Sequence, residues 1–431
     1  MVKKDRIIEA QKITGMFKDL PLSRGETHLF VDRFDELNMI RNIGLLLDES
    51  IYGVAGETGS GKTTLFNILD FEEDPIHKII LHITEKDSKE IIIADLLDKL
   101  CLAIRENKHL SFAHKEAEEI ISFLKEEELK GQEKGVKVGK IIEGEKKWTR
   151  TSKERFNLSA IKGKLREMVK TMVKYDKVLC CIDEIDKETK KDVLVILDSL
   201  KDELIHKNLV VVIALPQLMY HQYVQDRIGL LKEGNLENIL KDIVPLHRMN
   251  DEDIDSLLIR RTRKFPDILS SKVRQLVVEF AAGNPREALL LCLNSLLKKK
   301  LRYPYEKDDF VLREEEIKNE MERFVKARIS GLKLSKRERQ ILKVASDQSI
   351  LTRSEIFRRS SQIYGIPSST IQTVVKSLLA KKIVKEVESD TYEIDKKIGL
   401  FFKYYDDSLP GAKTAKTVKT AKTAKAKKLR K

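Results

Sequence analysis

Cysteine is scarce in this sequence of 431 residues. Its four cysteines form no C-x-x-C pair: Cys101 and Cys292 stand alone, while Cys180 and Cys181 are adjacent within an apolar run. Disulfide-stapled folds and cysteine-ligated zinc sites both need recurrent cysteine spacing, so the sequence excludes the first and shows no sign of the second. We expect buried thiols in a reducing compartment.

Long apolar runs are absent as well. No stretch approaches the roughly 18 to 20 apolar residues of a membrane-spanning helix, and the first residues, MVKKDRIIEAQKI, lack the apolar core of a signal peptide. We therefore expect a soluble cytoplasmic protein with no membrane among its partners. Hydrophobic residues still make up 41% of the chain, enough for two or three folded domains.

Acidic residues are missing from the end of the chain. Residues 411–431 contain nine lysines and arginines and no Asp or Glu, and they account for most of the net charge of +13. A segment so polar cannot bury a core, so 408–431 is expected to be a disordered basic tail. Two interpretations of it remain open: contacts with nucleic-acid phosphates, which release counterions, or a solubilising terminus.

Short apolar runs in the first half of the chain have the length and residue types of buried strands. They alternate with amphipathic helical segments and lie at 51–55, 79–83, 177–182 and 209–215. Strands that alternate with helices are typical of a parallel α/β sheet. From about residue 250 the pattern becomes entirely helical, which predicts a change of domain.

A glycine-rich motif follows the first of these runs and matches GxxxxGK[ST] in full. In such a loop the glycines let consecutive backbone N–H groups point at phosphate oxygens, and the following helix adds the positive end of its dipole. Lys62 is expected to reach the β and γ phosphates, and Thr63 to supply a hydroxyl to Mg²⁺. The predicted ATP or ADP site consists of Gly56, Glu57, Thr58, Gly59, Ser60, Gly61, Lys62, Thr63 and Thr64.

Two carboxylates end the apolar run at 177–182. A buried strand places them at the carboxyl edge of the sheet, where ligands bind in open α/β folds. Asp183 is expected to hold Mg²⁺ together with Thr63. Glu184 is expected to orient and polarise the water that attacks the γ-phosphate, so Glu184 and Lys62 are the first candidates for catalysis.

Together with these two motifs, three further segments make the chain resemble an AAA+ ATPase of the archaeal Orc1/Cdc6-like group. The sequence FVDRFDEL at 30–37 is similar to the box that precedes the phosphate loop in that family, and DEID at 183–186 matches its form of the second motif. Asp226-Arg227 follows the fourth-strand region, and Gly283-Asn284-Pro285-Arg286 opens a lid helix. The resemblance covers about residues 28–405.

The resemblance implies a fold and a division of the chain. The expected fold is α/β: a P-loop AAA+ parallel sheet, an all-helical lid and a C-terminal winged-helix domain. The expected ranges are 1–27 for an N-terminal extension, 28–248 for the nucleotide-binding base with a charged insertion at about 111–158, 249–330 for the lid, 331–407 for the winged helix-turn-helix and 408–431 for the disordered tail.

The resemblance also implies roles for two arginines. Arg286 corresponds to the sensor 2 residue that contacts the γ-phosphate, and an arginine at a helix start needs an anion because the helix dipole is positive there. Arg227 corresponds to an arginine finger, which acts on the nucleotide of a neighbouring copy, so this role presumes a homo-oligomer. The alternatives are a surface salt bridge for Arg286 and a solvated helix position for Arg227.

The chain departs from the family at sensor 1. Its apolar run continues as Ala214-Leu215-Pro216-Gln217, whereas the family usually ends this strand with a polar residue, often Asn. Two interpretations of Gln217 remain open: it replaces sensor 1 from one residue further on, or it is a surface turn residue. The departure concerns hydrolysis, which is expected to be slow, rather than nucleotide binding.

The C-terminal part has the pattern of a winged helix. Helices are expected at 335–345, at 352–364 with a capping box at its start, and at 370–380 with Ser368 or Ser369 as its cap, followed by strands at 381–386 and 391–394. Polar residues near a recognition helix reach base edges while cations hold phosphates. The expected contacts with double-stranded DNA are made by Arg353, Ser368, Ser369, Thr370, Gln372, Thr373, Lys376, Lys381 and Lys382. A winged helix used for protein contacts is the alternative.

The sequence therefore predicts an ATP-hydrolysing AAA+ protein that binds DNA in the nucleoid. The expected role is that of a replication initiator, such as origin recognition or helicase loading with a replication partner. Two alternatives remain open. One is an archaeal regulatory or mobile-element ATPase of the STAND or transposition type. The other is a nucleotide-locked DNA-binding scaffold with little hydrolysis, which the missing sensor 1 Asn favours.

Overall fold

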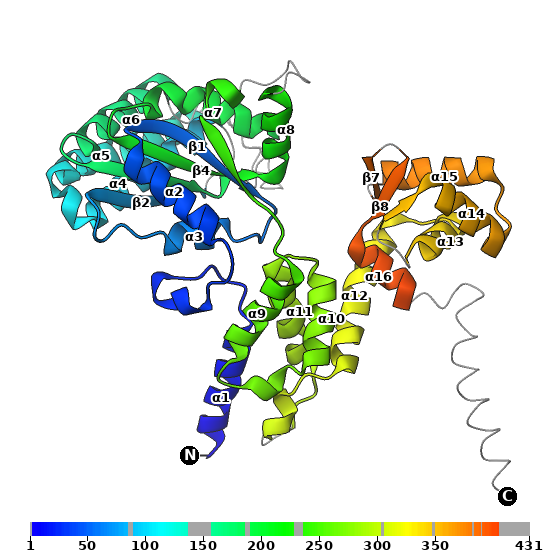
Figure 1. The fold of residues 1–431 in the computed structure, drawn as a ribbon. Coiled ribbons are helices and arrows are strands. Elements are labelled where there is room, and N and C mark those ends of the chain that lie inside the picture. The colour runs from blue at the N-terminus through cyan, green and yellow to red at the C-terminus, as the bar shows by residue number, and fades with distance from the viewer. Residues whose placement is uncertain are drawn as a thin grey trace, which may run out of the picture. The chain divides into compact units, whose positions relative to one another are not determined.

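The structure is a computed structural model that describes residues 2–84, 89–136, 157–185, 190–227, 236–302, 306–346, 350–381, 383–388 and 390–404. The chain divides into two compact units (Figure 1). We call residues 20–248 the base unit, and residues 1–19 together with 249–431 the second unit. The predicted basic tail and residues 137–156 of the predicted insertion lie outside the described residues.

A five-stranded sheet forms the centre of the base unit. Its strands are β1 (Glu49–Gly56), β2 (Ile76–His82), β3 (Lys177–Asp183), β4 (Leu209–Pro216) and β5 (Asp242–Leu246), in the order β2-β3-β4-β1-β5. Every neighbouring pair is parallel. The predicted parallel α/β sheet is confirmed and the four apolar runs are four of its strands, whereas β5 is an edge strand that the apolar runs do not include.

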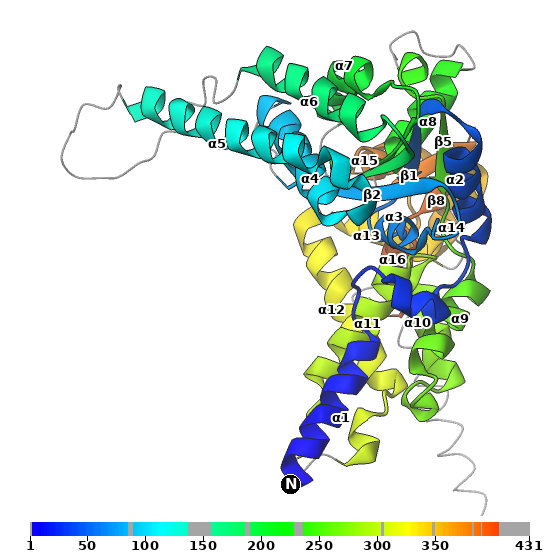
Figure 2. The same cartoon turned by 90° about the vertical axis from the view of Figure 1, so that its left-hand side faces the viewer.

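Helices cover both faces of this sheet (Figure 2). One face packs against α2 (Phe34–Leu46) and α3 (Lys62–Ile68), and the other carries α4 (Lys89–Glu106), α5 (His114–Val136), α6 (Leu158–Met172), α7 (Lys190–Leu204) and α8 (Gln217–Arg227). Short 3-10 turns lie in the base unit at Arg24–Leu29 (η1), Lys108–Ala113 (η2) and Leu236–Asn238 (η4). Two more lie in the second unit, at Pro266–Ile268 (η5) and Lys307–Phe310 (η6). Coverage on both faces explains why the strands are continuously apolar.

The adjacent thiols of β3 illustrate this double coverage. Cys180 belongs to the core beneath α4–α7, whereas Cys181 belongs to the core beneath α2 and α3. All four cysteines are buried and unbridged, as expected. Burial raises the pKa of the Cys181 and Cys101 thiols to about 12, so they stay protonated and serve as small apolar side chains.

The second unit begins with a helical part. It contains α1 (Val2–Met16), α9 (Asp251–Thr262), α10 (Ser271–Ala281), α11 (Pro285–Lys298) and α12 (Glu314–Leu332). Asn250, Ser270 and Asn284 each accept hydrogen bonds from the first turn of the helix that follows, so side-chain caps set where α9, α10 and α11 begin. The predicted change to a helical pattern near residue 250 is confirmed.

The remainder of the second unit has the element order of a winged helix. It consists of α13 (Lys336–Ala345), β6 (Ile350–Thr352), α14 (Arg353–Tyr364), α15 (Ser368–Ala380), β7 (Val384–Glu388), β8 (Thr391–Ile394) and a further helix, α16 (Lys396–Tyr404). The strands form an antiparallel sheet in the order β6-β8-β7. The division of the second unit into a lid and a winged-helix domain stays a prediction.

Two local predictions in this region are wrong in detail, and one strand was not predicted. The residue that caps α15 is Pro367, so Ser368 and Ser369 lie inside its first turn instead of capping it; proline suits this place because its missing N–H costs nothing there. Strand β7 spans 384–388 and not 381–386, because 381 still caps the preceding helix. Strand β6 is too short to leave a periodic signal in the sequence.

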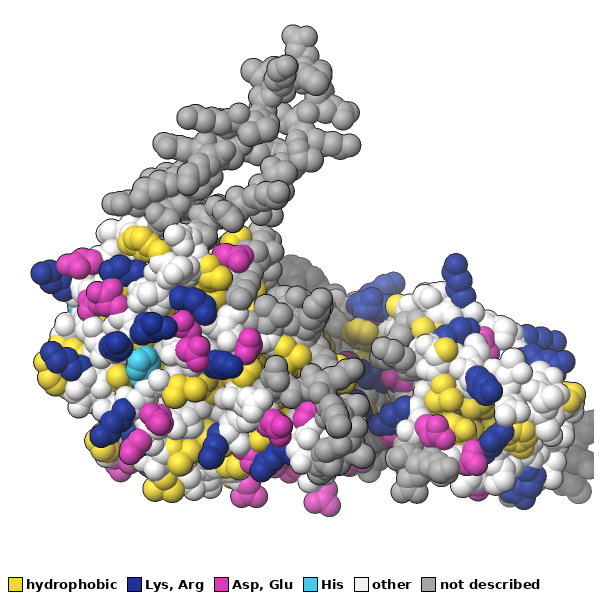
Figure 3. Space-filling model, turned by 90° about the horizontal axis from the view of Figure 1, so that it is seen from above, with side chains coloured by type: hydrophobic (Ala, Val, Ile, Leu, Met, Phe, Trp, Pro, Cys, Tyr) yellow, Lys and Arg dark blue, Asp and Glu magenta, His cyan; other side chains and the backbone are white. Residues whose placement is uncertain are grey.

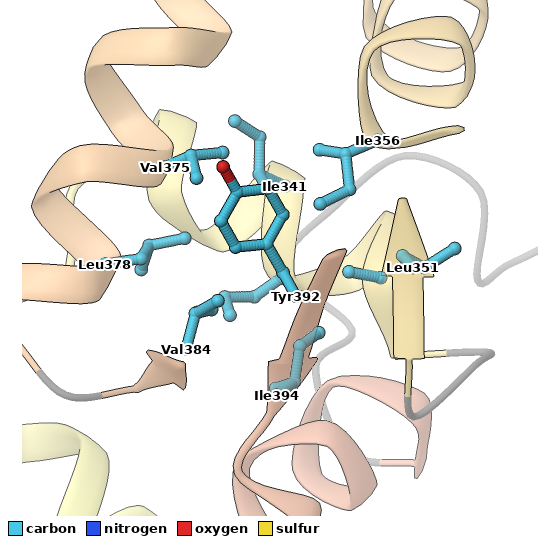
Figure 4. Close-up of a pocket in the computed structure, with 10 residues that line it drawn as sticks. Ile341, Leu351, Ile356, Val375, Leu378, Val384, Tyr392 and Ile394 are labelled. Atoms are coloured by element: carbon cyan, nitrogen blue, oxygen red, sulfur yellow. The ribbon is translucent and has the colours of Figure 1, made fainter. Parts of the chain in front are cut away.

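The core of the C-terminal part of the second unit, formed by α13–α15 and β6–β8, is close-packed and apolar. Tyr392 of β8 points its ring between Ile341, Val375 and Leu378, and Leu351 and Ile356 close the far side (Figure 4). The cavity among these side chains measures about 10 Å³. This volume is at the lower limit for a single water molecule, so this core has no room for a ligand. Among the described helices, none is long and apolar enough to cross a membrane.

Candidate nucleotide-binding site

The glycine-rich loop lies where the sequence predicts it, between the carboxyl end of β1 and the start of α3. Gly59 and Gly61 have φ values of +85° and +101°, which favour glycine, and Gly61 caps α3. A Cβ on Gly56 would lie 2.5 Å from the Ser60 Oγ. The glycines are therefore required by the tight turn itself.

Lys62 folds back into this loop. Its side chain is 5% exposed, and its Nζ donates hydrogen bonds to the carbonyl oxygens of Gly56 at 2.8 Å and Glu57 at 3.2 Å. The buried Ser60 Oγ has no hydrogen-bond partner within the described chain. Buried polar groups of this kind are normally satisfied, so the loop combines a buried cation with hydrogen-bonding capacity that an anion can meet.

The two threonines that begin α3 differ in their surroundings. The Thr64 Oγ1 accepts a hydrogen bond from the Leu22 backbone N–H at 3.2 Å, so this hydroxyl is engaged by the segment before η1. The Thr63 hydroxyl instead is among the groups that favour the ionised form of Asp183. Of the two, Thr63 is the one associated with the second motif, and its role as a magnesium ligand stays a prediction.

Asp183 ends β3 and is 2% exposed. Its Oδ1 accepts a hydrogen bond from the Glu184 N–H at 2.9 Å, while its buried Oδ2 has no hydrogen-bond partner among the described residues. Burial raises the pKa of this carboxyl, but His82, Thr63 and the Glu184 amide outweigh it and lower the pKa overall. An ionised, buried carboxylate oxygen without a donor is the chemistry that a divalent cation completes.

His82 is a neighbour of Asp183 that the sequence did not single out. It ends β2, directly opposite Asp183 in the parallel register, and its Nδ1 lies 3.6 Å from the Asp183 Oδ2. This separation is too long for a hydrogen bond, so the two form an ion pair when His82 is protonated. The Asp183 carboxylate raises the pKa of His82, partly opposed by burial. The signal available in the sequence was that His82 is the one polar residue within the apolar run at 79–83.

Glu184 follows with an uncommon backbone conformation. Its φ is +74°, in the left-handed region that non-glycine residues rarely adopt. Strain of this kind persists where surrounding structure holds a side chain in a required place, and it is frequent at functional sites. Gln217, the sensor 1 candidate, begins α8 immediately after Pro216, which pairs with Gly56 of the phosphate loop. The fold thus brings both residues to the carboxyl edge of the sheet.

Arg227 does not lie at this edge. Its guanidinium pairs with Asp242 at 3.6 Å and donates to the Tyr223 hydroxyl at 3.3 Å. Asp242 lies opposite Tyr52 in the parallel register. Tyr52 precedes the phosphate loop by four residues, a distance of roughly 13 Å along a strand. The arginine therefore cannot act on the loop of its own base unit, and a role on a neighbouring copy stays a prediction.

Arg286 belongs to the second unit and sits in the first turn of α11. Its Nε lies 3.3 Å from the Asp19 carboxylate, and both side chains are partly exposed. This is the surface salt bridge that the sequence left open as the alternative, and the γ-phosphate contact stays a prediction. A second arginine, Arg248, was not predicted and holds Glu57 of the phosphate loop at 2.8 Å. No motif marks Arg248, because its partner lies 191 residues earlier in the chain.

The residues predicted to contact DNA fall into two groups. Ser368, Ser369, Gln372, Thr373 and Lys376 are exposed along α15, and Thr370 is half-buried beside them. Two of the predicted cations are engaged elsewhere: Arg353 pairs with Asp390 at 3.1 Å, and Lys381 pairs with the buried Glu338 at 2.6 Å. Lys382 lies outside the described residues.

Comparisons with known proteins give no match to a family model and no match among curated proteins. Among solved structures, the chain is similar to a Walker-type ATPase of Pyrococcus abyssi, at 15% identity over 90% of this chain and 99% of that one, with a TM-score of 0.48. It is similar to the ORC2 protein of Aeropyrum pernix, solved as ADPNP and ADP complexes, at 11% identity over 90% and 96% of the two chains and a TM-score of 0.43. The RuvB Holliday junction branch migration motor of Thermotoga maritima follows at 14% identity, 87% and 96% coverage and 0.36.

At 15% identity or less and TM-scores below 0.5, the similarities carry no conclusion about function. Function has to follow from the residues of this chain.

Proposed function

We propose that this protein binds ATP with Mg²⁺ at the phosphate loop, hydrolyses it slowly, and binds double-stranded DNA through its C-terminal winged helix, in the manner of a replication initiator. One observation carries the proposal. The buried ammonium of Lys62, held on loop carbonyls, and the donor-free Oδ2 of Asp183 belong to the carboxyl edge of the same parallel sheet. A buried cation and a buried carboxylate at one sheet edge suit a phosphate and its metal ion.

The chain's own residues account for the chemistry. The loop N–H groups and Lys62 bind the phosphates of ATP, and Lys62 exchanges the carbonyls of Gly56 and Glu57 for phosphate oxygens. The Thr63 hydroxyl and the Asp183 carboxylate would hold Mg²⁺, which neutralises charge on the phosphates when bound. Glu184 positions the attacking water, and the reaction proceeds by positioning and charge stabilisation. Arg286 would contact the γ-phosphate in place of Asp19.

Binding to DNA is supported by the surface of α15. Its exposed hydroxyl and amide side chains can reach base edges, and Lys376 can hold a phosphate. The part of the surface that belongs to the winged helix shows more lysine and arginine than carboxylate (Figure 3). Because Lys381 and Arg353 have carboxylate partners, the proposed contact set rests on Ser368, Ser369, Thr370, Gln372, Thr373 and Lys376, with the basic tail adding non-specific affinity.

The ATPase proposal is tested by nucleotide titration and γ-phosphate release on three variants. Lys62→Ala is expected to abolish nucleotide binding, whereas Glu184→Gln is expected to bind ATP without turning it over. Lys115→Ala, which changes a lysine whose side chain is 90% exposed, is the matched control and should behave as the wild type. Wild-type hydrolysis by the Glu184→Gln variant, or wild-type nucleotide binding by Lys62→Ala, would remove the roles assigned here.

A scaffold that holds ATP and barely hydrolyses it is the second candidate function. It is favoured by the end of β4, where Ala214 and Leu215 are buried and apolar and the first amide side chain is Gln217. Phosphate release measured with and without duplex DNA separates the two.

A regulatory or mobile-element role, rather than replication initiation, would appear as binding at promoters or element ends when bound sites are mapped across a genome.

A further inference from the structure

The amino edge of the base unit's sheet, opposite the phosphate loop, carries an exposed pair of aromatic rings. Tyr175 precedes β3 and is 63% exposed, and Phe112 of η2 is 37% exposed. Their ring centres are 4.9 Å apart at an interplanar angle of 86°, an edge-to-face arrangement. Strand β3 extends from Lys177 to Asp183, which is roughly 20 Å, so the ring pair is remote from the nucleotide site.

Four exposed lysines belong to the same edge. Lys108 begins η2, Lys170 lies in the last turn of α6, and Lys174 and Lys207 lie in the connections that lead into β3 and β4. None of the four has an ion-pair partner among the described residues. The Lys174 ammonium instead lies 5.0 Å from the centre of the Tyr175 ring. The edge therefore combines flat aromatic surface with positive charge that no carboxylate neutralises.

Hydrogen bonds and ring contacts join these segments into one surface. The Asn208 side chain donates to the Val173 carbonyl oxygen at 3.4 Å, which holds the connection before β4 against the end of α6. The rings of His77 and His109 stack with their centres 5.0 Å apart, and the His77 Nε2 lies 3.3 Å from the Asp176 carboxylate. His77 thus links η2 to the connection before β3. We call the shared surface the amino-edge patch: Lys108, Phe112, Lys170, Lys174, Tyr175 and Lys207.

A buried carboxylate beside α6 is matched by other cations. Glu203 of α7 is 3% exposed, and its Oε1 lies 3.5 Å from the Lys162 Nζ and 3.4 Å from an Arg166 nitrogen. Both of these cations belong to α6, one and two turns before Lys170. Because Glu203 already faces two cations, it leaves the charge of Lys170 available to a ligand.

The pKa of His206 indicates the sign of the electrostatic field at this edge. Burial lowers the pKa of this histidine, and Lys170 and Arg166 lower it further. The carboxylates of Glu49 and Glu203 raise it, but by less than the two cations lower it. The cations therefore dominate the field beside the connection before β4, as an anionic ligand requires.

We propose that the amino-edge patch binds single-stranded nucleic acid, with a base stacked on the Tyr175 ring and the lysines on the phosphates. Aromatic rings within a basic surface suit an unpaired strand, because every base has a flat face and every nucleotide adds one phosphate. A duplex keeps its bases stacked on one another and cannot use the ring. The inference goes beyond the proposed function, since it needs neither ATP nor the winged helix.

The experiment measures, by fluorescence anisotropy, the dissociation constants of the full-length protein for labelled oligo(dT) and for a duplex of the same length. Tyr175→Leu is expected to weaken oligo(dT) binding about tenfold, the loss of one stacked base, and to leave duplex binding unchanged. Tyr175→Phe keeps the ring and should keep the affinity. Parallel titrations with oligo(U) identify whether DNA or RNA is preferred, and a loss with either strand in Tyr175→Leu supports the inference.

The lysines are tested by salt dependence. The double variant Lys170→Ala, Lys207→Ala should reduce the slope of log affinity for oligo(dT) against log salt by about 1.4, at about 0.7 per phosphate contact. The matched control is Lys241→Ala, which changes an exposed lysine just before the edge strand β5 and should alter neither slope nor affinity.

Unchanged oligo(dT) and oligo(U) affinity in Tyr175→Leu, or an equal loss for duplex and single strand, would overturn the inference. The winged helix and the basic tail are intact in every variant, so their contributions cancel in the comparison with the wild type. If the wild type binds oligo(dT) but no duplex, the proposed function has failed while the inference stands.

Discussion

Replacement of Glu338 by Gln is expected to destabilise the predicted winged helix by an amount that depends on pH. Glu338 lies in the first turn of α13 and is 3% exposed. Its carboxylate accepts hydrogen bonds from the Ser335 N–H at 2.6 Å, the Ser377 hydroxyl at 2.8 Å and the Lys381 ammonium at 2.6 Å. One side chain therefore caps α13 and ties it to the end of α15.

The magnitude follows from the pKa of this carboxyl. Burial raises it, but Lys381, Ser335 and Ser377 outweigh burial and lower the pKa from 4.5 to about 2. At about 1.4 kcal/mol per pKa unit, the ionised carboxylate contributes about 3 kcal/mol at pH 7. Because the folded-state pKa lies below the unfolded one, the contribution is complete above about pH 5 and falls as pH approaches 2. At pH 3 it is about 1 kcal/mol.

Hydrogen exchange of the amides in α13 and α15 measures this quantity in the full chain. The only tryptophan, Trp148, lies outside the winged helix, so exchange is a more local probe than fluorescence. The difference in opening free energy between the wild type and Glu338→Gln should shrink by about 2 kcal/mol from pH 7 to pH 3. Taking the difference cancels the titration of other carboxylates. A difference that stays constant with pH would refute the role assigned to the ionised carboxylate.

A suitable control for this experiment is Glu322→Gln. Glu322 forms a 2.5 Å pair with Lys326 on α12, and the Lys326 side chain is 60% exposed. Exposed pairs contribute between nothing and about 1 kcal/mol, so the exchange of α13 and α15 should be unaffected at either pH. An equal effect from Glu322→Gln would mean that the loss of any negative charge, rather than this network, destabilises the unit.

Three further predictions follow from local geometry and charge. Thr352→Ala removes the capping box of α14 and should cost about 1 kcal/mol in the exchange of that helix. Gly53→Ala places a Cβ 2.6 Å from the Leu215 Cδ1 and should lower the urea midpoint of the base unit, at a cost of roughly 1–3 kcal/mol, whereas Gly163→Ala, with open space at its Cβ, should not. Deletion of 411–431 should weaken DNA affinity at low salt and flatten its salt dependence without changing nucleotide binding; unchanged affinity would identify the tail as a terminus only.

Local patterns were sufficient for the parts of the fold that local physics determines. Strands covered on both faces must be apolar throughout, so β1 to β4 were visible as short runs. The phosphate loop was visible in the sequence because the backbone geometry of this eight-residue turn requires glycine at fixed positions. The capping box of α14 is a contact between Thr352 and Glu355, three positions apart, and it was equally visible.

Contacts between distant segments were not visible in the sequence. Lys381 belongs by position to a set of cations near a recognition helix, yet its partner is Glu338, 43 residues earlier. Arg248 meets Glu57 across 191 residues, and His82 meets Asp183 only because β2 and β3 pair in parallel register. The sequence around a basic residue does not indicate whether the fold places a buried carboxylate beside it.

The sequence by itself determined the sheet class, the residues of the phosphate loop and most of the elements, with β5 and β6 as exceptions, since periodicity and backbone conformation are properties of neighbouring residues. Only the tertiary structure decided which charges are paired: Arg286 with Asp19, Lys397 with Glu287, and Lys381 with Glu338. The reason is physical. A charge interacts with whatever the fold brings within a few ångströms, and that distance is set by the packing of the whole chain rather than by any stretch of it.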